Sequence, residues 1–169
     1  MTPHDLEVES YVFWRAHGCD HLHASAWCGN EAGETSFRTD RPVGDRSTGG
    51  AYGPAQHHSG RIEIIKRATG IDIKTAQHID QLKGILWEVT QSKEYGHVYA
   101  DFLKAATMEQ AITVLVRQFE RSGSQDRDIR RRTALGNHYM EEFKLWVQPS
   151  STISRISSLA PASLRRRSR

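Results

Sequence analysis

The strongest constraint on the fold of this chain is a helical period in its apolar residues. In the clearest stretch, large apolar residues recur every three or four positions: Met108, Ile112, Leu115, Val116 and Phe119. This spacing predicts an amphipathic helix, and Thr107 and Gln110 just before it have the spacing of a capping box. Such a helix must bury its apolar face against other elements, so the pattern favours a helical domain.

The same period predicts further helices along the chain. We expect them at about residues 5–17, 21–34, 58–70, 72–89, 98–105 and 126–147. Asp72 is the expected cap of the fourth, and Trp146 is expected to face inward in the last. Gly29 and Gly33 are expected to interrupt the second helix. Residues 35–53 lack the period and are rich in turn formers.

Residues 148–169 differ from the rest in composition. They are rich in Ser and Arg, and four of the final five residues are arginine. We expect a disordered basic tail here and one domain over residues 3–147. The net charge of the chain is only +3, so the body before the tail is close to neutral. Cell-wall polymers, nucleic acids and membranes are all anionic, so this charge does not identify a partner.

Several classes of protein and site are disfavoured by the sequence. No apolar run is long enough to span a bilayer, and the acidic N-terminus does not resemble a signal peptide. We therefore expect synthesis in the cytoplasm without a signal peptide. Cys19 and Cys28 are expected to be free thiols. The histidines His21, His23, His57 and His58 lack the spacing of known zinc motifs, so no metal or other cofactor is implied.

Glu34 is the candidate for acid chemistry. It lies in the last turn of the predicted helix at 21–34, where the macrodipole disfavours a charged carboxylate. If Trp27, Phe37 and Tyr52 wall it from water, burial disfavours the charge further. A carboxylic acid that keeps its proton can protonate a glycosidic oxygen. The alternative for Glu34 is an exposed helix-end carboxylate, and Glu31, one turn earlier, is expected to be solvated or supporting.

Three segments resemble the phage-tail lysozyme family, within the superfamily of goose-type lysozymes and lytic transglycosylases. They begin at Gly29 and Asn30 before Glu34, at Gly50 before Gln56, and at Phe119 before Glu120, across residues 20–143. The resemblance implies a mainly α, lysozyme-like domain with a small β-hairpin or loop lobe forming one wall of a cleft. It also implies cleavage of the β-1,4 bond between N-acetylmuramic acid (MurNAc) and N-acetylglucosamine (GlcNAc) in peptidoglycan, with Glu34 as the acid.

The resemblance also implies residues that bind sugar. Tyr52 and Gln56 offer a ring face and an amide to the substrate, and Gly53 permits close approach of the backbone. His57 stands where the family often has Trp. Glu120 belongs to the family's aromatic-Glu-Arg-Pro-Gly block, in which this chain has Ser instead of Pro. Glu120 could line the cleft or lie at a solvated helix end.

The mechanism depends on a second carboxylate, and Asp45 is the best-placed candidate, with Asp40 in reserve. A water held by Asp45 would make the protein a hydrolase, whereas attack by the muramic acid 6-hydroxyl would make it a lytic transglycosylase with 1,6-anhydro products. A structural turn role for Asp45 is equally open.

Two alternatives belong to other classes. One is a non-catalytic virion or wall-binding module, which would have replaced Glu34. The other is a nucleic-acid binder, which would show a basic helix face, whereas these helices mix both signs. The expected partners are therefore peptidoglycan strands and phage virion proteins, with no specific nucleic acid. The protein would reach the cell wall through a pore, through lysis or as part of a virion.

Overall fold

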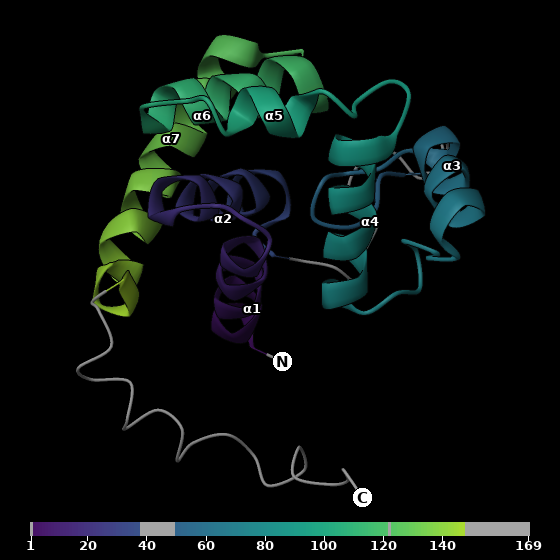
Figure 1. Cartoon of the computed structure of the whole chain (residues 1–169), viewed down its shortest axis with the longest axis horizontal. Coiled ribbons are helices and arrows are strands. Elements are labelled where there is room, and N and C mark those ends of the chain that lie inside the picture. The colour runs from purple at the N-terminus through teal and green to yellow at the C-terminus, as the bar shows by residue number, and fades with distance from the viewer. Residues whose placement is uncertain (1, 38–49, 122, 148–169) are drawn as a thin grey trace, which may run out of the picture.

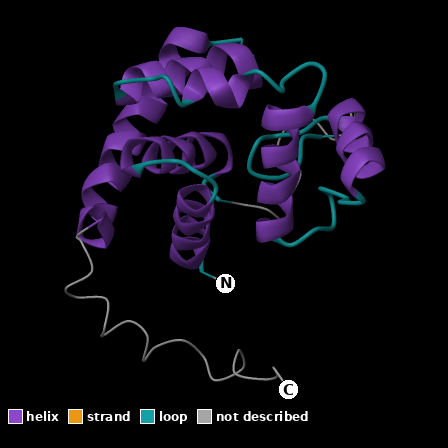
Figure 2. Ribbon diagram, in the orientation of Figure 1, coloured by secondary structure: helices purple, strands orange, loops and turns teal. Residues whose placement is uncertain are grey.

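A computed structural model of the chain describes residues 2–37, 50–121 and 123–147, and this part is mainly helical, as predicted (Figure 1). The helices are α1 Pro3–Ala16, α2 His21–Thr35, α3 Ser59–Thr69, α4 His78–Gln91, α5 Val98–Phe102, α6 Met108–Val114, the π-helix η2 Leu115–Glu120, α7 Gln125–Glu142 and the 3₁₀ helix η3 Phe143–Val147. Figure 2 shows helices and loops in this part of the chain, and Tyr52 and His57 form an isolated antiparallel bridge. The predicted loop lobe lies largely at 38–49, outside the described residues, as does the tail at 148–169.

Helix α2 lies in the middle of the molecule. Figure 1 shows α7 crossing one side of it, α1 below it, and α5 and α6 above it. The crossing with α7 is very close, because a Cβ on Gly29 would lie 2.5 Å from the backbone nitrogen of Gly136. Helix α2 continues through Gly29 and Gly33, so the prediction that they interrupt it is wrong. The contact with α7 stabilises a helix that glycine alone would weaken.

The main core is aromatic and lies around α2. The rings of Trp14 and Trp27 stack with centroids 4.1 Å apart and planes 5° apart. A second, smaller core lies between α3 and α4 and contains Ile62, Ile65 and Ile73. Cys19 and Cys28 are buried and free, as expected. In the described part of the chain, no helix combines the length and the apolar character that crossing a membrane requires.

Two local predictions are corrected by the structure. Helix α4 begins after Gln77, so Asp72 does not cap it. Asp72 instead forms an ion pair with Lys66 at 2.8 Å, and its carbonyl oxygen accepts hydrogen bonds from Thr75 and Ala76 in a turn that precedes the helix. Trp146 is 53% exposed. Its ring meets Tyr11 and Phe143 edge-on, since η3 runs along the rim of the core and not into it.

Candidate functional site

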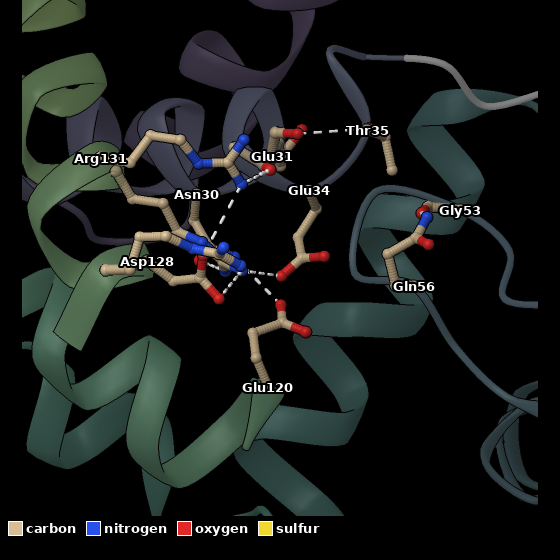
Figure 3. Close-up of polar contacts among 12 residues, drawn as sticks. Asn30, Glu31, Glu34, Thr35, Gly53, Gln56, Glu120, Asp128 and Arg131 are labelled. Carbon is tan, nitrogen blue, oxygen red and sulfur yellow. Dashed lines mark hydrogen bonds and ion pairs between the residues drawn. The ribbon is translucent and has the colours of Figure 1, made fainter. Parts of the chain in front are cut away.

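Four elements bring the candidate site residues together. Figure 3 shows Glu34, from the last turn of α2, pointing toward Glu120, the last residue of η2. Asn30 and Asp128 lie on one side of Glu34, and Gln56 from the loop at 50–57 lies on the other. Two of the predicted sugar-binding residues, Gln56 and Glu120, therefore lie beside the predicted acid.

Arg132 of α7 holds these groups from inside the protein. Its side chain is 2% exposed, and it donates hydrogen bonds to Glu34 and, from Nη1 at 2.6 Å, to Oδ1 of Asn30. Asn30 is fully buried and donates from Nδ2 to Oε1 of Glu120 at 3.1 Å. Glu34, Arg132, Asn30 and Glu120 thus form a continuous chain of polar contacts. Gly33 makes room for it, since a Cβ there would lie 2.6 Å from Cγ of Arg132.

The environment of Glu120 favours its neutral form. Burial is the main cause, the negative charge of Glu34 is the next, and together they raise the pKa of Glu120 to about 8. The charges of Arg61 and Arg132 and the hydrogen bond from Asn30 act in the opposite direction but are weaker. These surroundings therefore favour the protonated form of Glu120.

Gln56 is presented by a strained turn. Tyr52 and His57 exchange two backbone hydrogen bonds of 2.8 and 3.0 Å, and this bridge closes the loop. Within it Gly53 has φ +71° and Gln56 has φ +49°. The left-handed region is costly for a residue with a side chain, so a glutamine held there is a feature typical of functional loops.

The structure places the side chains of His57 and Tyr52 against other protein groups. His57 is completely buried, and its Nε2 lies 2.8 Å from Oε2 of Glu88, which also accepts two hydrogen bonds from Arg61 at 2.8 and 2.9 Å. Its burial favours support of the turn over contact with sugar, and it also lowers the pKa of His57. Tyr52 packs against the smaller core, and its ring lies 5.4 Å from Nζ of Lys74.

The apolar wall expected around Glu34 is replaced by polar neighbours. Trp27 stacks on Trp14, and Phe37 meets His78 and Tyr139 edge-on. The side chain of Glu34 is only 15% exposed, with Arg132 as its direct partner. Asp40 and Asp45 lie outside the described residues.

Glu31 has a structural role and is not solvated. It is 1% exposed and accepts hydrogen bonds from Ser10 at 2.7 Å and Trp14 at 3.1 Å. Its other oxygen lies 3.4 Å from Nε2 of His78, whose Nδ1 lies 2.8 Å from Glu9. These contacts tie α1, α2 and α4 together.

A hollow of about 960 Å³ lies near His78, not at Glu34. It is lined by residues of α1, α7 and the segment 74–78, and by Ser36 and Phe37 at the end of α2. Neither Glu34 nor Glu120 lines it.

Sequence reasoning missed Arg132 and gave Asn30 no role. Arg132 is one of three consecutive arginines, of which Arg130 and Arg131 are exposed. A run of charged residues normally indicates an exposed surface, so the sequence did not predict that Arg132 is buried. The helical spacing could have indicated it. Asp128, Arg132 and Gly136 are four residues apart and therefore share one face of α7, and Gly136 on this face contacts α2.

Comparison with known proteins gives one match. A sequence model of the family described as phage tail lysozyme matches residues 6–143. Searches of the curated proteins and of the solved structures each found no match. The matched range includes every residue of the polar chain from Glu34 to Glu120.

Proposed function

The chain belongs to the phage tail lysozyme family, and from this we propose that it cleaves the MurNAc-β-1,4-GlcNAc bond of peptidoglycan with Glu34 as a catalytic carboxyl group. Family membership implies a lysozyme-like role in peptidoglycan cleavage. The bond, the catalytic residue and the mechanism are our proposal.

The observation that carries this proposal is the setting of Glu34. Its carboxyl group is fixed by a buried arginine, faces a second carboxyl group on Glu120, and has the Gln56 amide on its open side (Figure 3). An amide donates to and accepts from sugar hydroxyl and N-acetyl groups. A carboxyl group fixed beside a sugar-binding amide is suited to exchange a proton with a glycosidic oxygen.

The test is the activity of Glu34→Gln on purified peptidoglycan. The amide of glutamine can neither donate a proton nor carry a negative charge, so we expect turnover to fall by roughly 10²–10⁴-fold while the fold stays intact. Glu63→Gln, which changes an exposed glutamate of α3, is the matched control and should keep full activity. If Glu34→Gln keeps more than about a tenth of the wild-type rate, Glu34 is not the catalytic group.

Mass spectrometry of the released muropeptides decides the mechanism. Reducing ends mean hydrolysis, 1,6-anhydro ends mean lytic transglycosylation, and no products from the wild-type chain would contradict the enzymatic proposal in favour of a non-catalytic wall-binding module. Asp45→Asn adds to this, because a hydrolase that uses Asp45 to orient water would lose most of its rate, whereas a transglycosylase would not.

A further inference from the structure

Glu34 and Glu120 face one another (Figure 3) but have different partners. Glu34 forms an ion pair with Arg132, whereas Glu120 accepts a hydrogen bond from the neutral amide of Asn30. Asp128 lies 4.0 Å from both Arg131 and Arg132, and Arg61 makes two hydrogen bonds to Glu88. Among the described residues, no ion pair is formed by Glu120, in a place where both Arg132 and Asn30 are buried. Like charges that are close and poorly solvated are relieved when one of them takes up a proton.

We propose that Glu34 and Glu120 form a carboxyl dyad that carries one proton between them, and that Glu120 is the second catalytic carboxyl group of the site. This inference rests on the proposed glycosidase function for its chemistry, but the existence of the dyad can be tested without activity. The raised pKa of Glu120 supports it. The dyad gives the site a second carboxyl group without recourse to Asp45.

The two carboxyl groups have different surroundings in this chain of polar contacts. Glu34 pairs directly with the guanidinium of Arg132, which stabilises an anion. Glu120 accepts from the neutral amide of Asn30 at 3.1 Å, which is compatible with a neutral acid.

The dyad divides the work of cleavage. Its proton passes to the glycosidic oxygen as the C1–O bond breaks, and the bonding electron pair leaves with that oxygen. The carboxylate that remains charged stabilises the positive charge developing at C1 and the ring oxygen. When water or the muramic acid 6-hydroxyl adds to C1, its proton returns to the dyad, which restores the resting state.

The dyad itself is tested by carbon-13 NMR of the protein labelled at the glutamate carboxyl carbons. In the wild-type chain, we expect one glutamate carboxyl group to titrate near pH 8. In Glu34→Gln the neighbouring charge is gone and Arg132 is released, so the pKa of Glu120 should fall by about one unit or more. In Glu120→Gln, which keeps the Glu34–Arg132 ion pair, the titration near pH 8 should disappear.

Three results would overturn the dyad. These are a wild-type chain without any carboxyl group that titrates above pH 7, a Glu120 titration unchanged in Glu34→Gln, and a high titration that survives Glu120→Gln. The groups that face Glu120 are Glu34 on α2, Arg61 on α3, Arg132 on α7 and the Asn30 amide. Glu94→Gln, which changes an exposed glutamate paired with Arg121 near η2, is the control and should leave the titration in place.

Kinetics then test the catalytic role of Glu120. The wild-type rate should fall on the alkaline side near pH 8. In Glu120→Gln the alkaline fall of the pH–rate profile should move to lower pH by more than about one pH unit, and the rate at pH 7 should fall by roughly 10²-fold. A merely structural role of Glu120 would lower the rate without changing the pH at which the rate falls. If the wild-type chain releases no muropeptides, the proposed function fails while the NMR result stands. If the wild-type chain is active and Glu120→Gln has the same rate, only the catalytic role of Glu120 is refuted.

Discussion

Arg132 contacts both Glu34 and Asn30 from a position where it is almost completely removed from water. A buried guanidinium is expensive unless its donors are used, so its place in the fold depends on these partners. The same contacts fix the direction in which Glu34 points. The stability of the α2–α7 contact and the geometry of the site therefore depend on one side chain.

Replacing Arg132 by methionine should destabilise the protein by about 3–5 kcal/mol, because it leaves Glu34 and Asn30 without their buried donor. Urea unfolding gives the measurement. The exposed neighbour Arg130→Met should change the free energy of unfolding by less than about 0.5 kcal/mol. The double variant Arg132→Met with Glu34→Gln should recover part of the loss, because the unpaired charge is also removed. A loss below about 1 kcal/mol in the single variant would show that Arg132 is not a structural partner of Glu34.

His78 should make stability depend on pH. Its burial opposes a positive charge, but the hydrogen bonds and charges of Glu31 and Glu9 outweigh burial and raise its pKa. A raised pKa in the folded state stabilises the protein fully below the unfolded value of about 6.5, and this contribution is lost as pH rises through the folded value. The free energy of unfolding should therefore decrease as pH increases above about 6.5.

The comparison of His78→Asn with the wild-type chain isolates this contribution. Guanidinium unfolding at pH 5.5, 7 and 8.5 should show a destabilised variant at pH 5.5 and a smaller difference at pH 8.5. His138→Asn, which changes an exposed histidine of α7, should leave the pH dependence unchanged. A difference between His78→Asn and wild type that grows with pH would contradict the assignment of a raised pKa.

The close crossing of α2 and α7 brings the residues of the candidate site together. At the crossing, Gly29 and Gly136 let the two backbones approach, and this approach brings Arg132 within reach of Glu34. Helix packing of this kind requires small residues where the ridges meet. The two glycines therefore serve the tertiary contact.

Gly29→Ala should cost about 1–3 kcal/mol, since its Cβ would lie 2.5 Å from the backbone of Gly136 and one helix must move. The control is Gly60→Ala in α3, where no atom lies within 4 Å of the added Cβ. That change should stabilise the protein by about 0.5–1 kcal/mol, because alanine is the better helix former. Thermal unfolding of both variants gives the comparison, and equal effects would mean that the close crossing is not required.

Backbone strain in the described residues lies just after helices and in the loop at 50–57. Within the described residues, the non-glycine residues with positive φ are Ser36, Phe37, Gln56 and Arg121. Each lies within three positions of Glu34, Gln56 or Glu120. Moreover, Glu120 ends a π-helix, a form that recurs at functional sites. The fold therefore places its least favourable backbone where the candidate site residues are.

The helices could be predicted because their apolar faces repeat, and the observed bounds of α1, α2 and α3 differ from the predicted ones by about two residues at most. Glu34 and Glu120 could be proposed as site residues from their motifs. Their closeness could not be predicted, since it depends on a glycine contact between α2 and α7. Likewise, nothing in the sequence separates the buried Arg132 from Arg131 beside it.

Over the whole molecule, the site joins the two cores. Glu34 and Glu120 come from the elements around the main core, whereas Gln56 comes from the loop tied to α3 and α4. Arg61 links the two parts, because its guanidinium lies 4.5 Å from the Phe119 ring centroid and 4.7 Å from that of Tyr95 while it binds Glu88. A change in the separation of these parts would move Gln56 relative to the carboxyl groups, and the contacts of Arg61 oppose such a change.

The basic tail is expected to act on intact cell walls and not on small glycan fragments. Residues 150–169 contain few large apolar residues, and their arginines would be attracted to an anionic cell wall. We predict that a chain ending at Pro149 keeps its thermal stability and its activity on small soluble glycan fragments. Its activity on whole cell walls should fall, mainly at low salt.

Salt distinguishes this attraction from a specific contact. Above about 0.3 M salt the Debye length drops below roughly 6 Å, so the full and the shortened chain should converge in wall binding and activity. A chain in which the final arginines are replaced by glutamine, with the length unchanged, should behave like the shortened one, because charge and not length is responsible. Equal wall binding by the full and shortened chains at 20 mM salt would refute an electrostatic role of the tail. A defect that persists at high salt would also refute it, since screened attraction must weaken there.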